Sequence, residues 1–279
     1  MVETIEEIII NTDCTCSKII ASEEDVYRLP EPSIKPGTPA WHWLELEKYF
    51  MEECDGRLPV HVCDMQGPMD AAGQIWGYEG VYICAYEDED AFDHLMHTVM
   101  NAFYLLWEEQ KRSCGDNFVP THLYGWSWTP ANAAQATLSA DCMAMLSDPF
   151  FRAHYVPYIR EMGQRLGPVA VHSCGNFAAV AKALGEIPEV VAVNASQMDP
   201  KQLCEAGWNK DKMLICGGVD TAILPELARY RRENNLRVDM SMIPRDRDGK
   251  IITFPQSTWT SAHLEAINDC TKRIKDILY

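Results

Sequence analysis

Short apolar runs alternate along the chain with longer amphipathic segments. The apolar runs have the length and β-branched content of buried strands. They cover LPVHVCD (58–64), THLYGW (121–126), PVAVHSC (168–174), VVAVNAS (190–196) and KMLICGG (212–218). The segments with helical spacing cover 91–112, 148–166, 177–187, 222–234 and 261–278. This alternation with short loops predicts an α/β protein with a parallel sheet, either covered by helices on both faces or rolled into a barrel.

The predicted strands end in polar residues. The first ends in Asp64, the third in His172 and Cys174, the fourth in Asn194 and the fifth in Cys216. In parallel α/β folds, binding and catalytic groups gather where the strands end and the loops begin. We therefore expect a functional site at this edge of the sheet.

The segment AVHSCG, residues 170–175, places a histidine and a cysteine two apart at such an edge. Residues two apart on a strand face the same way, so Ala170, His172 and Cys174 are expected on one face and Val169 and Val171 on the other. A small residue beneath two potential ligands suits the interior of a barrel. The same pair also fits a buried thiol beside a hydrogen-bonded histidine.

The composition of the chain limits which binding partners and which cellular compartment are expected. A formal net charge of −17 argues against binding to nucleic acid or to an anionic membrane surface. The 11 cysteines are scattered over 279 residues, which favours free thiols in a reducing compartment over a disulfide framework. The sequence shows no basic signal segment and no long uncharged apolar run. We expect a single cytoplasmic domain over residues 1–279.

Several segments together resemble the uroporphyrinogen decarboxylase superfamily, which also contains cobalamin-dependent methyltransferases. They are EEDVYRLPEP (23–32), LPVHVCDMQGPMDAAGQIWG (58–77), the expected helical stretch LSADCMAMLSDPFF (138–151) and LICGGVDT (214–221). The resemblance implies a (β/α)8 TIM-type barrel. Only IEEIII precedes residue 20 where two strands of the family should stand, so we expect a barrel lacking the first one or two strands. Such a barrel is expected either to stay incomplete or to cover its open edge as a homodimer.

The resemblance favours the methyltransferase branch. The decarboxylases carry an Arg-Gln-Ala-Gly-Arg segment that is absent here, whereas His172 and Cys174 match the His-Xaa-Cys zinc ligands of the methyltransferases. The family's third ligand is usually a cysteine near the last strand, and residues 251–260 contain none. Cys216 and Asp64 are the two candidates to complete the site.

The implied activity is transfer of a methyl group between a small-molecule substrate and the cobalamin of a corrinoid partner protein. Zinc would hold a thiol or alcohol as its anion at neutral pH. One alternative is a lyase acting on a small carboxylate, with Asp64 and Asp141 as acid and base. The other is a catalytically silent barrel that binds a ligand or a partner.

Further residues are candidates for the substrate pocket. Trp126 stands at a predicted strand end, and we expect it to line the pocket with Trp76 behind it. Asn194 is expected to bind substrate from the end of its strand. Asp141 in SADC is either a helix cap or a carboxylate of the pocket, with the cap favoured.

Overall fold

A computed structural model describes residues 18–121, 134–221, 223–243, 245, 247–250 and 261–278, with the backbone alone described at 216–220, 239–243, 263 and 278. Its strands are β1 (Val60–His61), β2 (Phe118–Val119), β3 (Ala136–Ser139), β4 (Val169–Ser173), β5 (Val190–Ala195), β6 (Met213–Asp220) and β7 (Val238–Ile243). Its α-helices are α2 (Glu23–Val26), α3 (Pro39–Glu53), α4 (Pro68–Trp76), α5 (Tyr78–Glu87), α6 (Glu89–Cys114), α7 (Asp148–His154), α8 (Val156–Leu166), α9 (Ala178–Glu186), α10 (Pro200–Glu205), α11 (Leu224–Asn234) and α12 (Ser261–Leu278). Two short 3-10 helices are η1 (Gly115–Asn117) and η2 (Asp141–Met145).

The described strands form two sheets in which all pairs are parallel. β1 pairs with β2, and β3 to β7 lie side by side in chain order. Gln66, shortly after β1, forms a bridge with Ser139 at the end of β3 and so links the two sheets. Sequential strand order is the order of a barrel, whereas a doubly wound sheet reverses its order at a switch point.

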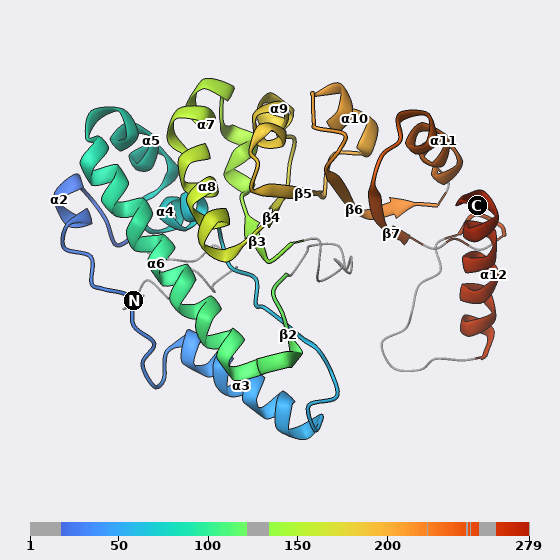
Figure 1. The fold of residues 1–279 in the computed structure, drawn as a ribbon, viewed down its shortest axis with the longest axis horizontal. Helices are drawn as coiled ribbons and strands as arrows, with labels where there is room; N and C mark the ends of the chain where they lie inside the picture. Colours follow the sequence, from blue (N-terminus) through green and yellow to red (C-terminus); the bar gives the residue numbers. More distant parts are fainter. Residues whose placement is uncertain are drawn as a thin grey trace.

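The larger sheet buries one face against helices. Figure 1 shows α7, α9, α10 and α11 next to one another along this face, and α7 contacts α9, α9 contacts α10 and α10 contacts α11. Leu138, Val171 and Val193 point into the main hydrophobic cluster on this side. This packing is why the strands of the sheet carry β-branched and leucine side chains at alternate positions.

The opposite face of the sheet carries small and polar side chains. Ser139, His172 and Asn194 are partners in register across β3, β4 and β5, and each is at most 2% exposed. Ala170 precedes His172 by two residues and Ala192 precedes Asn194 by two, and both alanines belong to a small cluster separate from the main core. Ala170 therefore lies on the face of β4 opposite Val169 and Val171, as the sequence predicts.

A close contact between two loops brings the end of β1 to the end of β3. The backbone N–H of Gly67 donates to the carbonyl of Ser139 over 2.7 Å. A Cβ at position 67 would lie 2.6 Å from that oxygen, so only glycine fits there. Pro68 then begins α4 at a position that needs no N–H donor. The Gly-Pro pair of the sequence therefore fixes α4 beside the strand ends.

The predicted strands agree with the structure in the middle of the chain. The runs 168–174, 190–196 and 212–218 form β4, β5 and β6. The run 58–64 forms a strand of two residues, β1, and the run 121–126 lies almost wholly outside the described residues. β3 and β7 do not correspond to apolar runs of the sequence, because β3 is short and rich in Ala, Thr and Ser and β7 alternates polar with apolar residues. The expected helical stretch 138–151 instead begins at the end of β3.

The predicted helix 148–166 is two helices. Tyr155 separates α7 from α8 with φ of −125°, and Pro157 stands in the first turn of α8. A proline in that position has no N–H for a hydrogen bond to the preceding turn and disfavours helical backbone before it. The amphipathic spacing continues across the break because both helices cover the same core.

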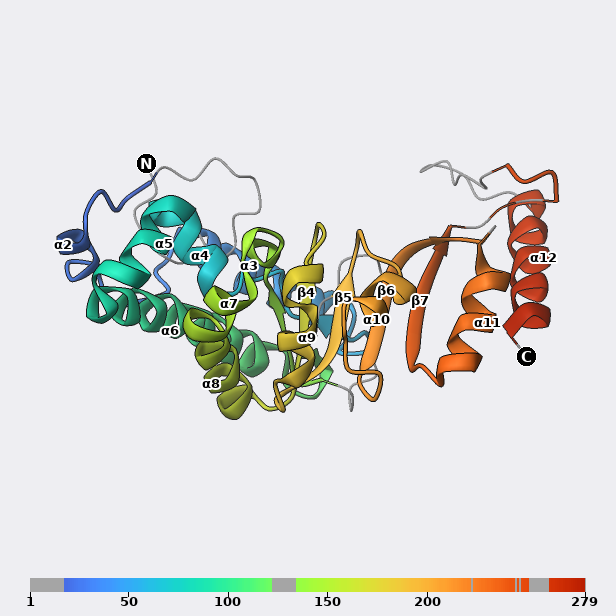
Figure 2. The ribbon, with the colours of Figure 1, turned by 90° about the horizontal axis from the view of Figure 1, so that it is seen from above.

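A closed (β/α)8 barrel is not formed by the described strands, in which β7 pairs with β6 alone. Figure 2 shows β7, α11 and α12 at one end of the molecule and α2, α5 and α6 at the other. The described strands therefore form an open, parallel arrangement within an α/β fold. Within the described residues, no helix is long and apolar enough to cross a membrane.

Candidate metal centre

Three potential metal ligands converge at the C-terminal ends of neighbouring parallel strands. Asp141 is the first residue of η2, which follows β3, while His172 lies on β4 and Cys174 directly follows it. One ligand atom from each side chain lies within 4.8 Å of the other two. The strand ends thus bring together an oxygen, a nitrogen and a sulfur donor from residues up to 33 positions apart.

The spacing of the three donors suits a tetrahedral ion. Sγ of Cys174 is 3.4 Å from Nε2 of His172, and Oδ1 of Asp141 is 3.8 Å from the same nitrogen. Two ligands held at about 2.0 to 2.3 Å from a tetrahedral zinc ion lie about 3.5 Å apart. Oδ1 of Asp141 also accepts the backbone N–H of Cys174 over 2.5 Å, so the carboxylate is already oriented toward the cluster. This bond shows that Asp141 faces the site, and the preference for a helix cap at this position is corrected.

The imidazole of His172 is held with its Nε2 directed toward the other two potential ligands. Nδ1 of His172 is 2.6 Å from Oδ1 of Asn194. Nδ2 of Asn194 donates to the carbonyl of Ile215 over 3.0 Å, which fixes the amide so that its oxygen faces the ring. Nδ1 must then carry the hydrogen, and the lone pair of Nε2 points to Cys174 and Asp141. In metal sites, a group that hydrogen-bonds the ring nitrogen not bound to the metal orients the histidine ligand in this way.

Cys174 is half-buried and has several polar groups around its thiol. Burial raises the pKa of its thiol, the hydroxyl of Ser196 opposes that rise, and the carboxylates of Asp141 and Asp64 add to it. The hydroxyl of Ser196 donates to Sγ over 3.3 Å. A bound cation would reverse this balance and favour the thiolate, which is the form that binds metal.

The remaining predicted site residues lie in different places. Asp64 is half-buried after β1 and close enough for its charge to act on Cys174. Cys216 lies on β6, where its backbone pairs with Ala195, and its side chain is outside the part of the structure that is described. Trp76 is buried in the main core on α4, where its indole packs against Gly80. Trp126 lies outside the described residues.

Asp70 is a buried carboxyl near the site that the sequence reasoning missed. It is 1% exposed, and its Oδ1 accepts the backbone N–H of Cys142 over 2.9 Å and the hydroxyl of Tyr78 over 2.8 Å. Burial raises the pKa of Asp70 to about 7, while the bonds from Tyr78 and Cys142 oppose the rise. The contact with Cys142 fixes the start of η2 and with it the position of Asp141. Asp70 follows Gln66 by four residues, and Gln66 lies at the strand ends. This closeness in sequence is what could have indicated Asp70 as a residue of the site.

The donor set fits zinc. Zinc accepts sulfur, nitrogen and carboxylate ligands in one tetrahedral site, and catalytic sites use three protein ligands and leave the fourth position for water or substrate. Magnesium and calcium prefer oxygen ligands throughout, which the histidine and cysteine do not supply. The orientation of His172 by Asn194 is a further feature of a metal site and does not depend on any bound ion.

Comparisons with known proteins show a distant likeness in fold. No protein-family model matches the chain, and no curated protein matches it. Among solved structures, the chain is similar to a methyltransferase from Methanosarcina mazei, with a TM-score of 0.53 and 12% sequence identity. The match covers 83% of this chain and 64% of that one. The chain therefore shares the α/β fold of that methyltransferase over most of its own length and spans less than two thirds of the neighbour.

Proposed function

We propose that this protein is a zinc-dependent methyltransferase that moves a methyl group between a small substrate and the corrinoid of a partner protein. The observation that carries the proposal is the convergence of Asp141, His172 and Cys174 at the strand ends. The likeness in fold to a methyltransferase supports it, as does the match of His172 and Cys174 to the methyltransferase branch of the superfamily.

Each residue of the site has a distinct task in this proposal. Asp141, His172 and Cys174 hold the metal, and Asn194 keeps the ring of His172 in the binding tautomer. Ser196 donates to Sγ of Cys174 and stabilises negative charge there. Zinc, when bound, supplies a Lewis acid that lowers the pKa of a thiol or alcohol of the substrate to near neutrality.

The site is open on the side where a large carrier would approach. The side chain of Asp141 is 42% exposed although His172 behind it is 1% exposed, so the cluster has one face toward solvent. A corrinoid, brought by the partner protein to this open face, would supply the cobalt that gives or takes the methyl group. We propose Trp126 as a wall for the methylated substrate and Asp64 as a polar group at the rim.

The corrinoid spectrum provides the test of this function. The purified chain, loaded with zinc, is mixed with methylcobalamin or cob(I)alamin and a panel of thiols and methyl donors. We expect a change of the corrinoid spectrum with at least one pair, and we expect His172→Ala and Cys174→Ser to abolish it together with zinc binding. Cys204→Ser is the matched control, because Cys204 is a half-buried cysteine on α10 away from the cluster.

The outcomes separate the competing functions. A spectrum that stays unchanged with zinc at full occupancy would contradict methyl transfer with the tested pairs. A zinc-free protein that releases carbon dioxide from a small carboxylate would favour the lyase instead. Transfer that persists at the same rate in the two ligand variants would remove the metal from the mechanism.

A further inference from the structure

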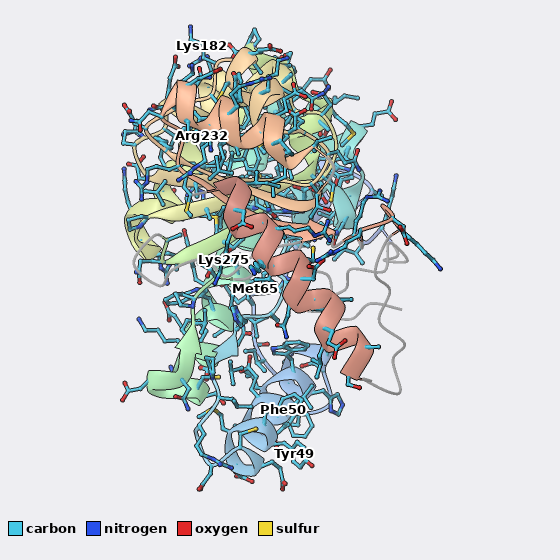
Figure 3. The ribbon with its side chains drawn as sticks, turned by 90° about the vertical axis from the view of Figure 1, so that its right-hand side faces the viewer. Tyr49, Phe50, Met65, Lys182, Arg232 and Lys275 are labelled. Carbon is cyan, nitrogen blue, oxygen red and sulfur yellow. The ribbon has the colours of Figure 1, made fainter. Side chains whose placement is uncertain are left out.

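A pocket of about 320 Å³ lies between α3 and the start of β1, away from the metal cluster. Trp43, Leu46 and Phe50 line it from α3, and Leu58 and His61 line it from the segment that enters β1. Figure 3 shows Phe50 on α3 at the end of the molecule opposite Lys182 of α9. Asp64 and the three residues of the metal cluster are not among the residues that line it, so this pocket is separate from the proposed active site.

The wall of the pocket is apolar and partly open to solvent. Phe50 is 48% exposed and Leu58 is 57% exposed, although both are large hydrophobic residues. Trp43 is fixed in place because its indole N–H is shared between Oε1 of Glu47 at 2.8 Å and Oε1 of Gln110 at 3.1 Å. A volume of this size and an aromatic lining are typical of sites for small molecules.

A single buried carboxyl lines this apolar pocket. Glu47 is 2% exposed, and its Oε1 accepts the indole N–H of Trp43. Its buried Oε2 accepts no hydrogen bond from a nitrogen or oxygen donor of the described residues, and the thiol of Cys114 is the weak donor beside the carboxyl. Burying a carboxyl oxygen without a strong hydrogen-bond donor costs free energy. A ligand that supplies such a donor could recover this free energy.

We propose that this pocket binds a small organic cation, an amine with an apolar body, whose ammonium group donates to Oε2 of Glu47. The apolar body would contact Leu46, Phe50 and Leu58, and the ring face of Trp43 would attract the positive charge. The net charge of −17 favours cations over anions around the whole molecule.

The protonation of Glu47 is consistent with this ligand. Burial raises the pKa of Glu47 to about 7, while the indole of Trp43 and the thiol of Cys114 oppose the rise. A cation against Oε2 would stabilise the ionised carboxylate and lower that pKa. The titratable groups on the neighbouring elements include Cys114 of α6, Cys63 after β1, and Cys54 and His61 of the pocket lining.

The proposal is tested by titration calorimetry, which measures the binding of three ligands that have similar shapes and different charges. Phenethylamine, 2-phenylethanol and 3-phenylpropionate are titrated into the full chain at about pH 8, where Glu47 is largely ionised. We expect phenethylamine to bind, the alcohol to bind more weakly and the carboxylate not to bind. Glu47→Gln should weaken binding of the amine by about tenfold or more and leave the alcohol nearly unchanged.

Two neighbours on α3 provide a matched pair of variants. Phe50→Ala removes a lining side chain and should weaken the amine and the alcohol alike, whereas Tyr49→Ala, on an exposed residue that is not part of the lining, should change neither. If Glu47→Gln fails to fold by circular dichroism, Leu58→Lys takes its place, because a cation at the exposed rim should repel the amine. Equal binding of the amine and the carboxylate, unchanged binding in the folded Glu47→Gln or Leu58→Lys variant, or no binding at millimolar amine would each overturn the proposal.

Discussion

Nδ1 of His172 lies 2.6 Å from Oδ1 of Asn194, and this contact decides which nitrogen of the ring can bind a metal. The two residues are partners in register on adjacent parallel strands, so the backbone itself sets their separation. Ile215 on the next strand then fixes the amide of Asn194 through its carbonyl. The orientation of the ligand is thus determined by three consecutive strands of the sheet.

Replacing Asn194 should weaken zinc binding without removing a ligand. In Asn194→Ala the ring of His172 loses its outer partner and can adopt the other tautomer, so we expect zinc affinity about 10 to 100 times lower. Competition with a coloured chelator measures this affinity. Asn209→Ala is the control, because Asn209 also bonds a main-chain carbonyl but lies away from the cluster. Equal affinity in the two variants would show that Asn194 does not support the ligand.

The third protein ligand can be identified by comparing substitutions of the three candidates with Cys174→Ser. Asp141→Asn should lower zinc occupancy nearly as much as Cys174→Ser, because Oδ1 of Asp141 lies in the cluster and a neutral amide binds zinc weakly. Asp64→Asn and Cys216→Ser should retain most of the zinc. The measurement is the metal content after dialysis against a weak chelator. Loss of zinc in Cys216→Ser with retention in Asp141→Asn would assign the third position to Cys216.

Asp70 should make the folded protein less stable as the pH rises. Burial raises the pKa of Asp70 from its ordinary value of 3.8 to about 7, so the folded state favours the protonated form. The stability it supplies is complete below pH 3.8 and is lost as the pH rises through 7. Asp70→Asn should therefore gain about 4 kcal/mol relative to the wild type between acidic and mildly alkaline pH.

Urea unfolding of both proteins at several pH values measures this difference. The contributions of the other titrating groups to the unfolding free energy are nearly the same in the two proteins and cancel. Asp93→Asn serves as a control, since Asp93 is an exposed aspartate that also accepts a tyrosine hydroxyl. A difference between Asp70→Asn and the wild type that stays constant with pH would contradict the raised pKa of Asp70.

The two faces of the sheet should respond differently to mutation. Leu138→Ala removes a fully buried side chain on the helix-covered face and should cost about 2 to 5 kcal/mol of unfolding free energy. Zinc affinity of the folded variant should stay close to that of the wild type, because Leu138 points away from His172. Urea unfolding of the metal-free protein and a chelator competition measure the two quantities. A large loss of zinc affinity in this variant would show that the faces are not independent.

The sequence predicts the central part of the fold and two of the three clustered residues. The apolar runs that form β4, β5 and β6 are long and rich in β-branched residues, so their periodicity is clear, and it places His172 and Cys174 at a strand end. The parallel order of these strands follows from the helices between them. The open edge beside β7 depends on long-range pairing, which local patterns do not specify.

Asp141 shows where local patterns become insufficient. β3 has four residues, Ala136 to Ser139, with little β-branched content, and the sequence around it resembles a helix. Without that strand, Asp141 cannot be assigned to the same sheet edge as His172. The approach of Gly67 to Ser139 and the buried position of Asp70 arise from tertiary contacts, so the sequence indicates the Gly-Pro turn but not what it touches.

X-ray absorption at the zinc edge tests the central claim most directly. The full chain is loaded with one equivalent of zinc and compared with Cys174→Ser. We predict one sulfur at about 2.3 Å and nitrogen or oxygen ligands at about 2.0 to 2.1 Å in the wild type, including an imidazole, and no sulfur in the variant. A shell made only of oxygen, or a sulfur that persists in Cys174→Ser, would contradict a metal centre built from Asp141, His172 and Cys174.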